Sequence, residues 1–104
     1  IVDYNGLQID GDVESVMGIA PLAQKWTAFN WHVIEADGHN LEQMQAAYDE
    51  ARRTMGKPSV IIMKTIKGKG ISFMENVAGW HGKAPNQQEL QNALAEIYGK
   101  ENEK

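Results

Sequence analysis

The sequence predicts an α/β fold in which a parallel sheet is flanked by helices. Three short segments of β type alternate with three helical segments along the 104 residues, and such alternation is typical of parallel sheets. The run Val60-Ile61-Ile62-Met63 is apolar throughout, as expected of a strand that is covered on both faces. The composition agrees, because 42% apolar and 23% charged residues are typical of an ordinary globular domain.

The first half of the chain is predicted to hold two strands and one helix. Ile1–Tyr4 is the first strand, and a long loop over residues 5–20 follows it. Pro21 stands where the first residue of a helix is favoured, and Asn30 favours a left-handed helix end. Between them, apolar side chains recur at helical spacing at Leu22, Trp26 and Phe29. Trp31–Ala36 is the second predicted strand.

A second helix is predicted from Asn40 onward, after the tight exit Asp37-Gly38-His39. Asn40 and Gln43 resemble a capping arrangement, and Gly56 and Pro58 end the helix. Its apolar residues fall at spacings of three and four, which is a strong helical signal. They are Leu41, Met44, Tyr48, Ala51 and Met55.

The last strand and helix complete the predicted order. Ser59–Thr65 is the third strand, and a second long loop covers residues 66–85. Asn86 with Glu89 opens the final helix, and Gly99 is predicted to end it. Its apolar side consists of Leu90, Ala93, Leu94, Ile97 and Tyr98.

Charge and composition exclude several classes of function. The net charge is −4 and the pI is near 5.3, whereas a general nucleic-acid binder needs a positive field to displace counterions from phosphates. Without cysteine, disulfides and thiolate zinc sites are excluded, and a reducing cytoplasm is compatible. The longest apolar stretch, Ser59–Met63, is far shorter than the roughly 20 residues that cross a bilayer.

Loops that leave the predicted strands carry the chemically informative residues. Residues 3–11 contain Asn-Gly and Asp-Gly pairs, residues 64–70 combine three lysines with two glycines, and residues 79–85 place His81 between glycines. Taken singly, these segments also suit a plain turn, a solvated surface loop and a structural histidine. Ligands of open parallel sheets bind at the carboxyl ends of the strands, so the lysine-rich exit favours a phosphate or diphosphate.

Taken together and in order, these segments resemble the diphosphate domain of transketolases. The matching motifs are Asp-Tyr-Asn-Gly-Leu-Gln-Ile-Asp-Gly, Phe-Asn-Trp-His-Val-Ile with Asp-Gly-His, Lys-Thr-Ile-Lys-Gly-Lys-Gly and Trp-His-Gly-Lys-Ala-Pro. The resemblance runs from Ile1 to about Tyr98. It implies that residues 1–99 are the second half of a Rossmann-like domain that binds thiamine diphosphate, and that residues 100–104 are a polar tail.

The resemblance assigns roles to five residues. Asn5 matches a metal ligand that acts through its side-chain oxygen, and Leu7 matches one that acts through its backbone carbonyl. Mg²⁺ or Ca²⁺ would suit these oxygen donors. Ile9 would pack against the cofactor ring, Lys67 would lie near the cofactor, and His81 would touch the diphosphate and face the substrate as the catalytic residue. At Lys83, the resemblance places a charge near the channel mouth.

Two parts of the family's active site have no match in the sequence. The metal-binding Gly-Asp-Gly segment is expected upstream of Asn5, and neither Asp3 nor Asp10 matches its aspartate. The glutamate that activates the cofactor is expected on a separate pyrimidine-binding domain. His32 and His39 are interpreted as strand and loop residues rather than site residues.

The implied activity is the transfer of a two-carbon ketol unit between sugar phosphates, in the cytoplasm and in the pentose phosphate pathway. The polar ending suggests a split enzyme, whose partner is a C-terminal subunit that carries the pyrimidine-binding domain in a homo- or hetero-oligomer. Two other hypotheses remain open here: an enzyme similar to 1-deoxy-D-xylulose-5-phosphate synthase, and a non-catalytic α/β interaction module.

Overall fold

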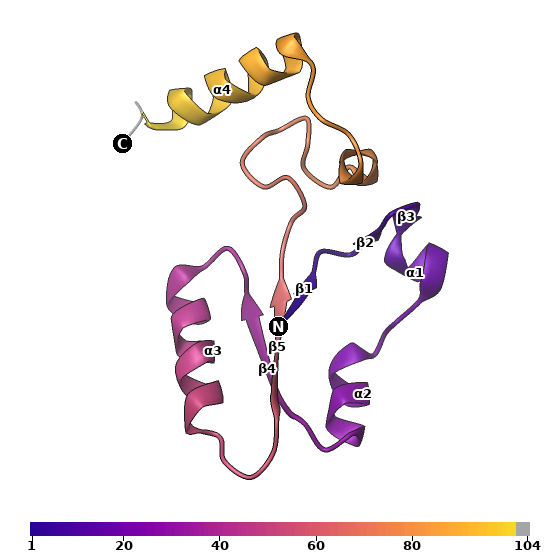
Figure 1. Cartoon of the computed structure of the whole chain (residues 1–104), viewed down its shortest axis with the longest axis vertical. Coiled ribbons are helices and arrows are strands. Elements are labelled where there is room, and N and C mark those ends of the chain that lie inside the picture. Colours follow the sequence, from indigo (N-terminus) through magenta and orange to yellow (C-terminus); the bar gives the residue numbers. More distant parts are fainter. Residues whose placement is uncertain (102–104) are drawn as a thin grey trace.

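The computed structural model describes residues 1–101 and contains the predicted parallel sheet. Its three strands are β1 (Val2–Tyr4), β4 (His32–Asp37) and β5 (Ser59–Lys64), in the order β1-β5-β4 (Figure 1). All pairings are parallel. The residues from Val60 to Met63 are only 2–6% exposed, which confirms that this apolar run forms a strand covered on both faces.

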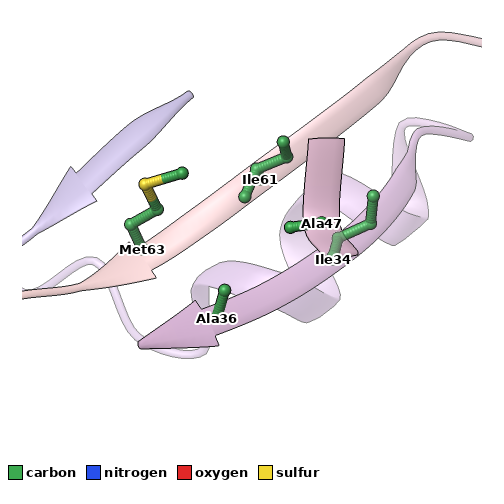
Figure 2. Close-up of a cluster of buried hydrophobic side chains, with 5 residues drawn as sticks. All are labelled: Ile34, Ala36, Ala47, Ile61 and Met63. Carbon is green, nitrogen blue, oxygen red and sulfur yellow. The ribbon is translucent and has the colours of Figure 1, made fainter. Parts of the chain in front are cut away.

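Helix α3 (Leu41–Arg53) packs on one side of the sheet and α2 (Leu22–Ala28) lies on the other (Figure 1). Under α3, the core is a cluster of buried side chains from β4, β5 and the helix. Figure 2 shows its members, Ile34, Ala36, Ala47, Ile61 and Met63. Because side chains alternate along a strand, the remaining buried residues of β5, Val60 and Ile62, face the side of α2.

The cap of α3 follows the prediction, while its apolar face is shorter than predicted. The Asn40 side chain accepts a hydrogen bond from the Gln43 N–H at 3.0 Å. Met44, Tyr48 and Ala51 pack against the core cluster. However, Leu41 and Met55 are 80% and 85% exposed, because they lie at or beyond the helix ends, where the turn carries them away from the sheet.

At the end of α2, Asn30 has the predicted left-handed conformation, with φ of 65°. The Trp26 ring meets the Trp31 ring edge-on, with centroids 4.7 Å apart, and so links the helix to the segment that enters β4. Phe29, the last of the three apolar residues at helical spacing, lies just outside the helix. Phe29 is 79% exposed, because the helix ends at Ala28 and residue 29 already belongs to the turn.

Both predicted loops contain short elements. Residues 5–20 include an antiparallel pair, β2 (Leu7–Gln8) and β3 (Gly11–Asp12), followed by helix α1 (Val13–Met17). The Asp12 carboxylate caps α1 by accepting from the Ser15 N–H at 3.1 Å. In the second loop, a 3₁₀ helix, η1, spans Ala78–His81.

Helix α4 spans Gln87–Glu101 and begins with the predicted capping box. The Asn86 side chain accepts from the Glu89 N–H, and the Glu89 side chain accepts from the Asn86 N–H, both at 2.8 Å. The helix does not end at Gly99 as predicted, because its hydrogen-bonded turn continues to Glu101. Of the expected tail 100–104, residues 102–104 lie outside the described part of the chain.

The chain is extended for its length. Its radius of gyration is 16.9 Å, against about 13 Å for a compact domain of this size. The loop after β5 and α4 lie beyond the carboxyl end of the sheet (Figure 1). Within residues 1–101, no helix has the length and apolar character that crossing a bilayer requires.

Candidate functional site

A cavity of about 180 Å³ lies beyond the carboxyl ends of β1 and β5, where the sequence predicts the site. It is lined by residues from the β1 exit, the β5 exit and η1. These residues are Asn5, Leu7, Gln8, Ile9, Lys67, Ala78 and His81. The structure thus brings together all five residues for which the resemblance implies a role, although they come from three separate segments.

The two strand exits meet because β1 and β5 are neighbours in the sheet. Tyr4, the last residue of β1, is in register with Lys64, the last residue of β5. One residue further on, the Thr65 N–H donates to the Tyr4 carbonyl at 3.3 Å. The Thr65 hydroxyl also donates to the Asp3 carboxylate. These hydrogen bonds therefore hold together the starts of the Asn5 loop and the Lys67 loop next to the cavity.

Asn5 is held in a tight turn at the start of its loop. Its side-chain oxygen accepts a hydrogen bond from the Leu7 N–H at 2.9 Å, an arrangement that asparagine favours in turns. Gly6 makes this turn with φ of 75°, and its carbonyl accepts from the Val13 N–H at 2.9 Å. An amide oxygen has two lone pairs, so the Asn5 oxygen retains one for a cation.

Lys67 is half-buried in a loop that contains several backbone hydrogen bonds. The Lys67 carbonyl accepts from the Asn76 N–H at 3.0 Å, and the Lys69 N–H donates to the Ile66 carbonyl at 3.2 Å. Gly68 has φ of 73°, and a Cβ there would lie 2.5 Å from the Met74 carbonyl oxygen. Only glycine fits this close backbone approach.

His81 ends the 3₁₀ helix η1 and is exposed at the cavity. The neighbouring Trp80 anchors this helix, because its indole N–H donates to the Phe73 carbonyl at 3.2 Å. The Phe73 and Trp80 rings also lie 5.9 Å apart, tilted against each other. The segment that carries His81 is therefore fastened to the loop that carries Lys67.

Lys83 makes contacts with its own segment and with α4. Its ammonium group lies 4.1 Å from the centre of the Trp80 ring and 2.5 Å from a carboxylate oxygen of Glu89. The hydrogen bond from Lys83, together with the one from the Asn86 N–H, lowers the pKa of Glu89 below its ordinary value. Lys83 thus links the His81 segment to the first turn of α4.

The donor set at the cavity fits a hard cation in part. The Asn5 amide oxygen and the Leu7 carbonyl are the ligand types that Mg²⁺ and Ca²⁺ prefer. Within residues 1–101, no three His, Asp or Glu side chains are grouped so that they would hold a metal ion by themselves. A cation at Asn5 would therefore need further oxygen ligands from a phosphate and from outside the described residues.

The other two histidines lie in a strand and in a loop, as expected. His32 in β4 is 2.7 Å from a carboxylate oxygen of Glu50 in α3. His39 follows β4, and its Nε2 accepts from the Ile66 N–H at 2.7 Å. No local pattern in the sequence marks this second contact, because Ile66 lies 27 residues further along the chain.

Comparison with known proteins finds a matching family model and several relatives of this chain. The family model described as "Transketolase, thiamine diphosphate binding domain" matches residues 1–104. Over 95 residues, the chain is 43% identical to a 6-deoxy-6-sulfo-D-fructose transketolase subunit of Clostridium sp. (strain MSTE9), covering 91% of this chain and 34% of that one. Over 97 residues, it is 38% identical to an apulose-4-phosphate transketolase subunit of Phocaeicola vulgatus, covering 93% and 34%.

Solved transketolases have the same arrangement of elements. The enzyme from Campylobacter jejuni superposes with a TM-score of 0.82 at 28% identity, over 93% of this chain and 15% of that one. The enzyme from Leishmania mexicana gives 0.80 at 30% identity, over 90% and 14%. The chain spans about a third of the length of the curated relatives named above. It belongs to the transketolase family, as a part of that family's thiamine diphosphate binding domain.

Proposed function

We propose that this chain supplies one side of the cofactor site in an enzyme that transfers a two-carbon ketol unit between sugar phosphates. The observation that carries the proposal is the cavity, which gathers Asn5, Leu7, Lys67 and His81 at the carboxyl edge of a parallel sheet. Such an edge is the usual ligand site of this class of fold. Thiamine diphosphate, when bound, supplies the electron sink for breaking and forming the carbon–carbon bond.

In this proposal Asn5 and Leu7 hold the metal ion. The turn between them fixes the Asn5 oxygen at 2.9 Å from the Leu7 N–H, so the ligand geometry is set before the ion binds. Mg²⁺ is the proposed ion, with Ca²⁺ as an alternative, because both share oxygen ligands with phosphates. The remaining protein ligand is assigned to a Gly-Asp-Gly segment upstream of Asn5.

Lys67 and His81 hold the diphosphate in the proposal. The chain is acidic overall, with a net charge of −4, so an anion needs a local source of positive charge. Lys67 lines the cavity from the β5 exit and suits a phosphate as a compact cation. His81 faces it from η1, where its imidazole can donate to a phosphate oxygen and exchange a proton with the substrate.

Ile9 is the proposed contact for the cofactor ring. It lines the same cavity and is 60% exposed, so its apolar surface is available to an aromatic group. Burying that surface against a ring would stabilise the bound cofactor by up to about 2 kcal/mol.

The proposed substrates are a ketose phosphate and an aldose phosphate, as in the transketolase reaction of the pentose phosphate pathway. Two relatives are named for other sugars, 6-deoxy-6-sulfo-D-fructose and apulose 4-phosphate. These relatives are named as subunits, which supports a C-terminal partner subunit with the pyrimidine-binding domain, within an oligomer. A cytoplasmic location is proposed from the family resemblance.

Turnover by the complete enzyme tests the reaction class. The chain, with its upstream segment and the partner subunit, is assayed with ribose 5-phosphate and a ketose phosphate, and separately with pyruvate and glyceraldehyde 3-phosphate. We expect turnover of the first pair. Turnover of only the second pair would indicate a deoxyxylulose-phosphate synthase. No turnover of these pairs or of the sugars for which the relatives are named, with cofactor bound, would indicate a non-catalytic module. Either result would contradict the proposal.

A further inference from the structure

The exits of β4 and β5 are pressed together at Gly38. The Gly38 N–H donates to the Lys64 carbonyl at 2.8 Å. A Cβ at Gly38 would lie 2.5 Å from Cγ2 of Thr65 and 3.2 Å from Cβ of Met63. A larger residue there would force the Thr65 side chain to move and would crowd Met63 and the Lys64 carbonyl, so glycine suits this contact between the Asp37-Gly38-His39 motif and β5.

This close approach brings the His39 ring to the start of the Lys67 loop. The Asp37 carboxylate accepts from the His39 N–H at 2.9 Å and so fixes the turn. The His39 ring then reaches Ile66, whose N–H donates to Nε2 at 2.7 Å. A backbone N–H can only donate, so Nε2 is the accepting nitrogen and the neutral ring carries its proton on Nδ1.

Two consecutive backbone N–H groups after β5 therefore donate hydrogen bonds in opposite directions, one to the end of β1 and one to the exit of β4. The Thr65 N–H donates to Tyr4 at the end of β1, and the Ile66 N–H donates to His39 after β4. Ile66 in turn accepts from the Lys69 N–H at 3.2 Å, which closes the turn around Lys67. Without His39, the Ile66 N–H would lose this hydrogen bond at the start of the turn.

We infer that His39 is a positioning residue that fixes Lys67 at the cavity through the Ile66 peptide. The inference rests on the proposed function, because it assigns His39 a role in cofactor binding that acts only through Lys67. It gives a function to a histidine that does not itself line the cavity. His39 is exposed, so replacing it leaves no buried void.

Three variants at position 39 distinguish the loss of the hydrogen-bond acceptor from a change in side-chain size. His39→Gln retains an acceptor at nearly the same distance from the backbone, whereas His39→Ala and His39→Met lack a strong one. Met preserves the length of the side chain and guards against an Ala variant that fails to fold. His32→Gln is the matched control, because it alters a histidine at the opposite end of β4.

The measurement is the Kd of thiamine diphosphate at saturating Mg²⁺, determined by calorimetry on the complete enzyme with its partner subunit. Loss of one hydrogen bond should weaken binding about 3- to 10-fold in the Ala and Met variants. Binding by His39→Gln and His32→Gln should stay within about 2-fold of the parent. Equal affinities of the Ala, Met and Gln variants would overturn the inference.

A double-mutant cycle with Lys67→Met distinguishes this inference from the proposed function. If His39 acts through Lys67, its replacement by Ala has no further effect once Lys67 is lost. If Lys67→Met weakens binding while His39→Ala does not, only the role of His39 fails. If Lys67→Met leaves the Kd unchanged, the proposed diphosphate site itself fails.

Discussion

The Thr65 hydroxyl donates a hydrogen bond to the Asp3 carboxylate and joins the exit of β5 to β1 below the cavity. Both residues lie one position from residues that are in register across the two strands, Tyr4 and Lys64. The contact therefore helps to keep the Asn5 loop and the Lys67 loop side by side at the carboxyl ends of β1 and β5.

Replacing Thr65 by Val should loosen this junction, because Val has the same shape but no hydroxyl. We expect the free energy of unfolding of the complete enzyme to fall by about 0.5–1 kcal/mol. Urea denaturation measures it as a lower midpoint at an unchanged slope. Thr65→Ser keeps the hydroxyl and is the control; equal midpoints for the Val and Ser variants would show that the contact contributes nothing.

Gly68→Ala should distort the loop that carries Lys67. A Cβ there would meet the Met74 backbone at 2.5 Å, at a φ of 73°. We expect a loss of about 2 kcal/mol or more in unfolding free energy, with weaker binding of thiamine diphosphate. The measurements are thermal unfolding and calorimetry.

Gly79→Ala is the matched control, because a Cβ at that position meets no atom within 4 Å. It should alter neither stability nor cofactor affinity by a comparable amount. A Gly68 variant that behaves like the Gly79 variant would contradict the assignment of a rigid turn around Lys67.

Stability should depend on the ionisation of Glu89. The hydrogen bond from Lys83 holds the pKa of Glu89 below its ordinary value of 4.5. A carboxyl group whose pKa is lowered by folding stabilises the protein above its unfolded pKa, and this contribution disappears as the pH falls through the folded pKa. The contribution of Glu89 should therefore be complete above pH 4.5 and be lost below it.

The Tm of the parent and of Glu89→Gln, measured from pH 7 downward, tests this dependence. The parent should be the more stable above pH 4.5, and the difference should shrink in more acidic solution. Glu42→Gln removes the same charge from an exposed position in α3 and serves as the control. A difference for Glu89→Gln that is constant with pH would exclude the Lys83 contact as its cause.

The sheet and the starts of α3 and α4 could be predicted from the sequence, because their signals are local. The apolar run from Val60 to Met63 identifies a strand buried on both faces, and Asn40 and Asn86 identify helix starts through their capping side chains. The gathering of Asn5, Lys67 and His81 was also predictable in outline, since the exits of parallel strands share one edge.

The remaining features depend on contacts that no local pattern encodes. Helix α1 is too short to show an apolar period, and α4 continues through Gly99 although glycine usually ends a helix. Strand β5 lies between β1 and β4, and no pattern within residues 59–64 predicts this strand order. The hydrogen bond between His39 and Ile66 also could not be predicted without the strand order, because it depends on β4 and β5 being neighbours.

The most direct test of the proposed site is the affinity of the complete enzyme for thiamine diphosphate, titrated by calorimetry at several Mg²⁺ concentrations. Asn5→Ala removes the amide oxygen, and it should weaken cofactor binding at least about 10-fold and reduce its dependence on Mg²⁺. Asn5→Asp, which keeps an oxygen donor, should retain that dependence. An Asn5→Ala enzyme with unchanged affinity and unchanged Mg²⁺ dependence would contradict a metal and diphosphate site at this edge of the sheet.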